Sequence, residues 1–336
     1  MRISQTCSSA NKARRRAAIL ALLLVAAALF ALCAGASGAS FIKGMRDIIT
    51  GENTPEARIV LYVRLPRVLA AVMSGAALSC AGVMIQGVLG NPLAGPNIIG
   101  VNAGAGFTTL LGAALGLSSY LLPAAAFLGA LGATLIILLL SNRLGASRVT
   151  VVLAGVALSS IISAGADLIT TLDPEATLGM STFLIGGFSG VNTSKLRAAA
   201  CYIGPALILA LLTAGDLDIL GLGDEVAQSV GLRVRRARAV QLILASVLAG
   251  AAVSFSGLLG FVGLIVPHAM RRIAGGEHRR LMPLCILGGA VFVLVCDTIA
   301  RTAFAPYELP VGILLSLVGG PFFLILLIKS RRRWDA

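Results

Sequence analysis

Long apolar segments separated by short polar ones dominate the chain. A helix that crosses a bilayer needs about 20 mostly apolar residues, because its backbone must satisfy every hydrogen bond internally. On that basis the pattern predicts an all-α membrane protein with about ten transmembrane helices. The eighth is too short to cross alone, and we expect a tilted or partial helix beside other protein. The predicted spans are 17–36, 66–88, 98–117, 120–141, 149–171, 196–214, 239–257, 259–273, 281–303 and 310–329.

The first apolar segment has two interpretations. Arg14, Arg15 and Arg16 precede it and the small residues Ala34-Gly35-Ala36 follow it, which is the layout of a cleavable signal peptide. The segment is long for a signal core, and many further spans follow. We therefore favour a retained first transmembrane helix.

Composition supports a membrane protein and disfavours other classes. The 336 residues are 57% hydrophobic and 12% charged, whereas soluble domains carry about 25% charged residues. The six cysteines form no C-x-x-C pair, and the histidines are His268 and His278 alone, so the sequence predicts neither a disulfide framework nor a metal site. The net charge of +13 comes from basic residues in short loops, which indicates topology and no nucleic-acid partner.

The basic residues also predict orientation. With the N-terminus inside, cytoplasmic segments and their boundaries hold 19 of the 27 Lys and Arg residues, and an even number of spans puts the C-terminus inside as well. The predicted organisation is a cytoplasmic tail at 1–16, a transmembrane domain at 17–329 with a cytoplasmic loop at 215–238, and a second tail at 330–336.

An internal repeat predicts two inverted halves of five helices each. Gly75-Ala-Ala-Leu-Ser-Cys-Ala-Gly82 and Gly250-Ala-Ala-Val-Ser-Phe-Ser-Gly257 are identical at five of eight positions, 175 residues apart. Five predicted spans separate the copies, so they run in opposite directions. Inverted repeats are common in transporters, whose substrate path lies near the interface of the halves. Chance similarity between two helices rich in small residues is the alternative.

The sequence predicts no enzymatic activity. It has no G-x-x-x-x-G-K-[ST] loop, zinc motif or G-x-S-x-G elbow. If ATP drives the protein, ATP and its magnesium ion must therefore bind a separate subunit, and we expect this chain to bind no cofactor.

Two acidic residues lie inside predicted spans. Asp297 has Arg301 four residues later on the same helix face, a pairing that lowers the cost of burying either charge. Asp167 has no local partner. Such residues can relay protons, so an ion-coupled secondary transporter of a small solute remains an alternative, although structural pairing or cavity lining is the favoured interpretation.

Two polar segments between spans are candidates for function. Asn91-Pro92-Leu-Ala-Gly95-Pro96-Asn97 breaks the helical pattern and predicts either a tight turn or a turn that lines a path. Residues 222–232 have an amphipathic helical pattern in a predicted cytoplasmic loop. They predict either a solvated loop helix or a helix that docks into an ATPase subunit.

Seven segments, in this order, resemble the FecCD/BtuC-type permeases of ATP-driven importers for iron-siderophore complexes, haem and cobalamin. They begin at Arg64-Leu-Pro-Arg67 and cover the chain to near its end. The other six are Gln86-Gly-Val-Leu-Gly-Asn91-Pro-Leu-Ala, Leu153-Ala-Gly-Val-Ala, Leu222-Gly-Asp-Glu-Val-Ala through Gly231, Gly260-Phe-Val-Gly-Leu-Ile-Val-Pro-His268, His278-Arg279 and Glu308-Leu-Pro-Val-Gly312.

The resemblance implies a type II importer permease in the bacterial cytoplasmic membrane. It also implies a homodimer around a central path, two ATP-binding subunits, an extracytoplasmic binding protein and import by alternating access. At the outer surface, Arg64, Arg67 and Arg301 match arginines that contact acidic residues of the binding protein. Interfacial anchoring is the alternative role for Arg64 and Arg67.

Other matches imply coupling and gating roles. The ATPase-docking loop corresponds to Asp224, Glu225, Ala227 and Gly231. The path and its cytoplasmic gate correspond to Gln86, Asn91, Pro92, Ser147, Arg148 and Val149, although Ser147-Arg148-Val149 departs from the small hydroxyl residues sometimes found at the gate. Residues 183–187 lie in the outside loop where relatives often have tryptophan. An iron chelate is the leading cargo, with haem and cobalamin as alternatives.

Overall fold

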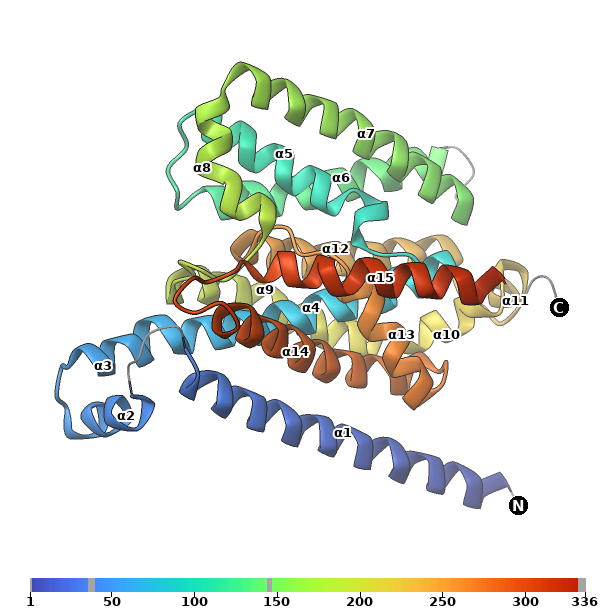
Figure 1. Ribbon diagram of the computed structural model, residues 1–336. Coiled ribbons are helices and arrows are strands. Elements are labelled where there is room, and N and C mark those ends of the chain that lie inside the picture. Colours follow the sequence, from blue (N-terminus) through green and yellow to red (C-terminus); the bar gives the residue numbers. More distant parts are fainter. Residues whose placement is uncertain (1, 36–39, 144–146, 332–336) are drawn as a thin grey trace.

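The computed structural model describes residues 2–35, 40–143 and 147–331, and these form helices joined by short connections (Figure 1). The predicted C-terminal tail lies mostly outside the described residues. The helices of the first half of the chain are α1 (Arg2–Cys33), α2 (Phe41–Thr50), α3 (Pro55–Arg58), the π-helical η1 (Ile59–Arg64), α4 (Leu65–Leu89), the 3₁₀ turn η2 (Pro96–Ile99), α5 (Val101–Ala114), α6 (Leu122–Arg143), α7 (Arg148–Leu172) and α8 (Pro174–Ile185).

The second half begins with α9 and repeats the pattern of long and short helices. Its elements are α9 (Thr193–Leu212), α10 (Ala214–Gly221), α11 (Asp224–Ser229), α12 (Val234–Ser256), α13 (Val262–Ala274), α14 (His278–Thr302) and α15 (Val311–Arg331).

A helix occupies each of the ten predicted spans. Seven helices of the described chain are long and apolar enough to cross a membrane alone. The other three predicted spans correspond to α5 with 14 residues, α13 with 13 residues and α15, whose apolar part is Val311–Leu326. The prediction that the eighth span is short is confirmed by α13.

Several predicted boundaries were wrong. The second span starts early, because Pro55 begins a continuous helical segment of 35 residues that ends at Leu89. The predicted tail 1–16 is helical from Arg2 onward as part of α1. Of the predicted helix 222–232, only Asp224–Ser229 is α-helical, as α11, because Gly223 at φ 101° separates it from α10, which ends at Gly221. Two unpredicted helices, α2 and α8, lie in the expected outside loops.

The two halves contact each other through equivalent helices. A Cβ on Gly75 of α4 would lie 2.1 Å from the carbonyl oxygen of Gly289, so the backbones of α4 and α14 touch directly. The matching glycine of the second copy, Gly250 of α12, instead faces Ala130 of α6. With five spans in each half, α6 is the fourth span of the first half and α14 is the fourth span of the second. Each copy of the repeat therefore packs on the fourth span of the opposite half. Small residues permit this close approach in lipid.

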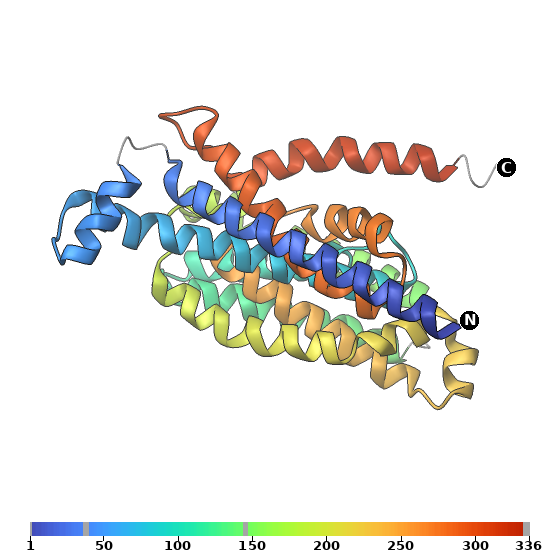
Figure 2. The ribbon, with the colours of Figure 1, turned by 90° about the horizontal axis from the view of Figure 1, so that it is seen from below.

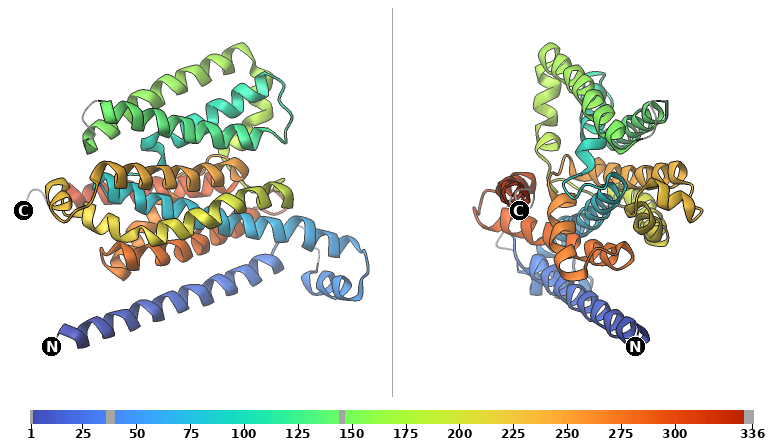
Figure 3. Two further views of the ribbon diagram at one scale, coloured as in Figure 1. Left: turned by 180° about the vertical axis from the view of Figure 1, so that it is seen from behind. Right: turned by 90° about the vertical axis from the view of Figure 1, so that its right-hand side faces the viewer.

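The molecule has two distinct ends. Both chain termini and α10–α11 lie at one end, here called the terminus end, and α2 and α3 lie at the other, the far end (Figure 1). The α2–α3 segment projects beyond the remaining helices in two perpendicular views (Figures 1 and 2). Seen from the terminus end, α5–α8 form one layer and α4, α12 and α14 another, and α6 packs on α12 between them (Figure 3, right).

Candidate functional sites at the two ends of the bundle

The three arginines predicted to dock a binding protein lie at the far end but are buried. Arg64, Arg67 and Arg301 are 3%, 6% and 2% exposed. Arg67 lies in the first turn of α4 and Arg301 in the last turn of α14, and these two helices are packed together over much of their length. The three arginines therefore lie at one end of the bundle, as predicted, whereas the expected surface position was wrong.

Internal acceptors occupy these arginines. The Arg67 guanidinium donates from Nε to both carboxylate oxygens of Asp297, at 3.2 and 3.1 Å, and from Nη1 to Glu308 at 2.5 Å. The predicted pair between Asp297 and Arg301 is present but looser, with 3.8 Å between Nε and Oδ2. A fork-shaped guanidinium is well matched to a carboxylate, so the main partner of Asp297 comes from α4 and not from its own helix.

The remaining two arginines cap the end of α1. The last four carbonyls of a helix have no partner within the helix, and basic side chains can supply one. Arg64 donates to the carbonyls of Leu32 and Cys33 at 2.8 and 3.1 Å, and Arg301 donates to that of Ala31. These contacts fix an otherwise largely unburied helix to the bundle. Arg64, Arg67, Arg301, Asp297 and Glu308 are called the arginine cluster below.

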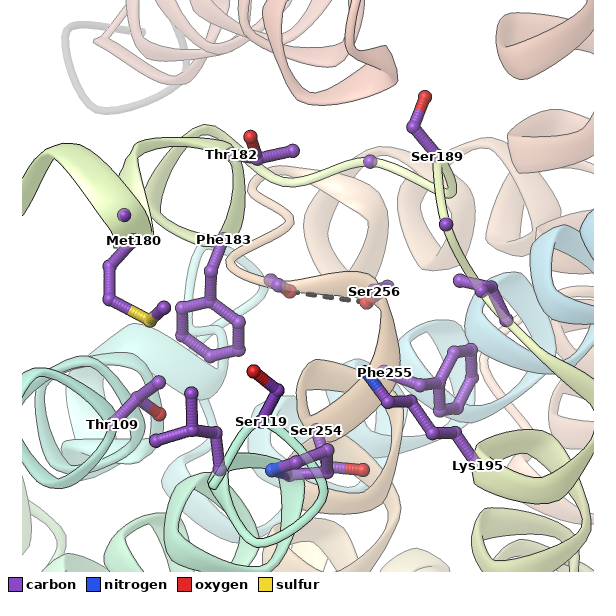
Figure 4. Close-up of a pocket in the computed structure, with 17 residues that line it drawn as sticks. Thr109, Ser119, Met180, Thr182, Phe183, Ser189, Lys195, Ser254, Phe255 and Ser256 are labelled. Atoms are coloured by element: carbon purple, nitrogen blue, oxygen red, sulfur yellow. Dashed lines mark hydrogen bonds between the residues drawn. The ribbon is translucent and has the colours of Figure 1, made fainter. Parts of the chain in front are cut away.

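A hydroxyl-lined cavity of about 210 Å³ also lies toward the far end (Figure 4). It is bounded by the end of α12, the α5–α6 connection and the segment that links α8 to α9. Its polar lining is Thr109, Ser119, Thr182, Ser189, Lys195, Ser254 and Ser256. Pockets that enclose drug-sized ligands measure about 300–1,000 Å³, so this cavity is too small to enclose a metal chelate.

A second cavity lies where the interrupted helical segments of the two halves meet. It measures about 280 Å³ and is lined by residues 93 and 95–98 from the first half and by Leu259, Phe261, Gly263 and Leu264 from the second. Non-helical backbone at this depth is tolerated where it is buried in protein or lines a water-filled path. Among the predicted path residues, Asn91 and Pro92 lie just outside it in an exposed turn, where the Asn91 side chain accepts from the amide of Leu93 at 2.9 Å.

Gln86, also predicted to line the path, is buried between the halves. Its side-chain amide donates to the carbonyl of Gly263 at 3.0 Å, and its oxygen accepts from Arg271. Both partners belong to α13. Gln86 therefore links α4 to the short helix of the opposite half.

The predicted coupling residues form a compact corner at the terminus end. Arg238 of α12 holds Asp224 at 2.6 and 2.8 Å, and Ala227 is fully buried. Glu225 and Gly231 are exposed, and Gly231 lies at φ 89°. The contacts of Asp224 and Ala227 fix α11 on the bundle, and they leave its outer face open.

That outer face is apolar. Leu222, Val226 and Val230 are 64%, 46% and 62% exposed, in a helical connection beyond the ends of the predicted spans. Exposed Arg233, Arg235 and Arg236 follow in the sequence. An apolar patch with a polar rim is typical of a protein interaction site. Sequence reasoning identified the loop, whereas the exposed valines became apparent only in the structure.

The predicted gate residues connect this corner to α7. Ser147 caps the N-terminus of α7 by accepting from the amide of Thr150 at 3.0 Å, and Val149 is exposed. Arg148 donates to the carbonyl of Leu220 at 2.7 Å and lies 3.9 Å from the Asp224 carboxylate. Arg148 therefore joins α10–α11 to the first turn of α7.

Together these features define a class of protein. Two inverted halves of transmembrane helices meet at paired helix breaks, and one end carries a corner with an exposed apolar face, while the sequence has no nucleotide loop. This is the architecture of a multi-pass permease subunit that depends on a separate ATPase.

Comparison with known proteins gives the particular family. The sequence profile of the FecCD transport family matches residues 22–329. The hemin transport system permease HmuU of Yersinia pestis is 38% identical over 324 residues, which are 94% of this chain and 96% of that protein. The Fe(3+) dicitrate transport system permease FecD of Escherichia coli is 38% identical over 276 residues, 81% of this chain and 86% of that one. The chain belongs to the FecCD transport family.

A structural comparison agrees. A solved structure of an inward-facing, metal-chelate type ABC transporter superposes with a TM-score of 0.85 at 31% identity and covers 94% of this chain and 99% of that one. The predicted fold class, an all-α permease of an ATP-driven importer, is therefore confirmed.

Proposed function

We propose that two copies of this chain form the cytoplasmic-membrane permease of an importer for an iron chelate. Two ATP-binding subunits act at the terminus end, which is then cytoplasmic, and an extracytoplasmic binding protein delivers cargo at the far end. ATP and magnesium bind the ATPase subunits, and this chain binds no cofactor. Its relatives that transport hemin and Fe(3+) dicitrate support iron chelates as a broad class and leave the charge of this chain's cargo open.

The exposed apolar face of α11 carries the proposal. It lies at the end that holds both termini, it is held in place by Asp224 and Ala227, and Arg148 links it to α7. A surface that binds an ATPase subunit and moves with it requires these three properties. Closure of the ATPase subunits on ATP then displaces α10–α11 and, through Arg148, the start of α7.

The size of the cavities supports a path shared by two copies. The two cavities described above measure about 210 and 280 Å³, below the 300–1,000 Å³ typical of pockets that enclose drug-sized ligands. A larger pocket of about 490 Å³, lined by α8, α15 and the α12–α13 connection, is open at the surface, and a second copy beside it would enclose a chelate there. In this arrangement the binding protein supplies most of the specificity, and the permease supplies a path of alternating access.

A charge placed on α11 tests the proposal. Val226→Glu introduces a carboxylate into the apolar face, and we expect the ATPase subunit to be lost from the purified complex, because an unpaired charge is costly at a desolvated contact. Gln228→Glu places the same charge on the opposite side of the same helix, and this variant should retain the ATPase. If both variants retained the ATPase subunit equally, α11 would not be part of the ATPase contact.

A further inference from the structure

Helix α7 carries a polar stripe that the fold does not cover. Ser160, Ser163, Asp167 and Thr171 are exposed, and their spacing of three and four residues places them on one side of the helix. Ile161, Leu168 and Leu172 are also exposed but lie on another side. The row that carries these polar residues continues toward the start of α7 as exposed Val149, Leu153 and Val156, so only the second half of the helix has a polar side.

Asp167 cannot face lipid at acceptable cost. A charged residue within a membrane helix is costly to expose to lipid, and such residues face a bundle interior or a water-filled cavity. Within the described part of the chain, the Asp167 carboxylate has neither an ion pair nor a side-chain hydrogen bond. Thr171 donates to the backbone carbonyl of Asp167 at 2.8 Å and leaves the carboxylate free. The side of α7 that carries this carboxylate therefore requires water or a polar partner outside the chain.

Further acidic residues lie at the outer end of α7. Asp173 and Glu175 follow Asp167 at the junction of α7 and α8, and neither forms an ion pair among the described residues. Asp173 caps α8 by accepting from the amide of Ala176 at 3.0 Å. The only basic residue of α7, Arg148, lies at the opposite end of the helix and is bound to the α10–α11 corner.

We infer that Asp167 lines the cargo path and selects against anionic cargo. This inference rests on the proposed function. With one copy of Asp167 from each subunit, the path repels chelates with net negative charge, such as ferric citrate, ferric catecholates and haem with its two propionates. It accepts neutral or cationic chelates. A ferric ion bound by three hydroxamates is neutral, and this is the cargo class that the geometry favours.

Charged thiol reagents measure both water access and local potential. Ser163→Cys and Thr171→Cys place a thiol one turn before and one turn after Asp167. Each is made in the full-length chain with Cys7, Cys33 and Cys201 replaced by serine, and the chain is reconstituted with its partner subunits in liposomes. The rates of modification by a cationic and an anionic methanethiosulfonate reagent are then compared. Because a carboxylate also changes thiol ionisation, which affects both reagents equally, the ratio of the two rates reports the potential alone.

Removal of the carboxylate should change that ratio. A unit charge about 6 Å away changes the local concentration of a charged reagent about threefold in water. The cationic reagent should therefore react about tenfold faster, relative to the anionic one, with Asp167 than with Asp167→Asn. Ile161→Cys, on the apolar side of the same helix, is the matched control and should react with neither reagent.

Two results would overturn the inference. If the Ser163→Cys and Thr171→Cys variants react as slowly as Ile161→Cys, the polar side is not accessible to water and Asp167 does not line a path. If they react readily but Asp167→Asn leaves the ratio unchanged, the residue does not select cargo by charge. Neither result bears on ATP hydrolysis stimulated by a binding protein, which tests the importer assignment separately.

Discussion

The arginine cluster at the far end and the α10–α11 corner at the terminus end were both predicted to bind partners, but they differ in what their side chains contact. The arginines use their hydrogen bonds internally, on Asp297, Glu308 and the carbonyls that end α1. The corner is held by Asp224 and Ala227 and leaves apolar side chains exposed. An arginine therefore indicates a docking surface only where no acceptor of the same chain takes up its hydrogen bonds.

The largest effect is expected from Arg67→Ala in the arginine cluster. Removing one partner of a buried ion pair costs about 3–5 kcal/mol, because the other charge is left uncompensated. Asp297 would keep only the looser contact with Arg301. We expect a much lower unfolding temperature in detergent, measured by intrinsic fluorescence or aggregation onset.

Arg58→Ala is the control for this change. Arg58 lies at the same end but is exposed and bonded to Asn53, so the unfolding temperature should barely change. If both variants were equally stable, and Arg67→Ala instead abolished only the association with the binding protein, the cluster would be a docking site and not a structural one.

A smaller effect is expected from Gly231→Arg in the corner. A residue with a side chain costs about 1–2 kcal/mol in the left-handed region, and Gly231 lies at φ 89° next to the apolar face of α11. Binding of the ATPase subunit should weaken about tenfold, and this can be measured by titrating the subunit onto the reconstituted permease.

Gly276→Arg provides the matching control, because Gly276 is exposed at the same end with open space around it. Equal binding by the two variants would show that the conformation of the α11 end does not matter for coupling.

The smallest effect is expected from Glu308→Gln. Glu308 is the outer partner of Arg67, with its side chain 38% exposed, and Asp297 remains in place when its charge is removed. Partly exposed ion pairs contribute about 0–1 kcal/mol, so the unfolding temperature should fall slightly. A loss as large as that of Arg67→Ala would mean that Glu308, and not Asp297, holds the cluster together.

The sequence predicted the helices and the family, because apolar segments and charge bias are local signals. It also predicted the short eighth span and the repeat, whose glycines pack on α14 and α6. Signals for two missed helices were present as well: Ser40 caps α2, and Asp173-Pro174 caps α8. A search for segments of membrane-spanning length overlooked them because both helices are short.

The burial of the arginines could not be predicted in this way. Arg67 meets Asp297 across 230 residues of chain, and Arg301 meets the carbonyl of Ala31 across 270. Nothing local to Arg64-Leu-Pro-Arg67 indicates that such acceptors lie nearby. The open face of α11 and the polar side of α7 were equally hidden, because both depend on which neighbours leave a helix uncovered.

ATP hydrolysis by the assembled complex tests the central claim most directly. The chain would be reconstituted in liposomes with its ATPase subunit, and hydrolysis measured with the binding protein empty, loaded or absent. We expect low basal hydrolysis that rises when the loaded binding protein is added on the side of the far end. Hydrolysis indifferent to the binding protein, or transport driven by an ion gradient without ATP, would contradict it.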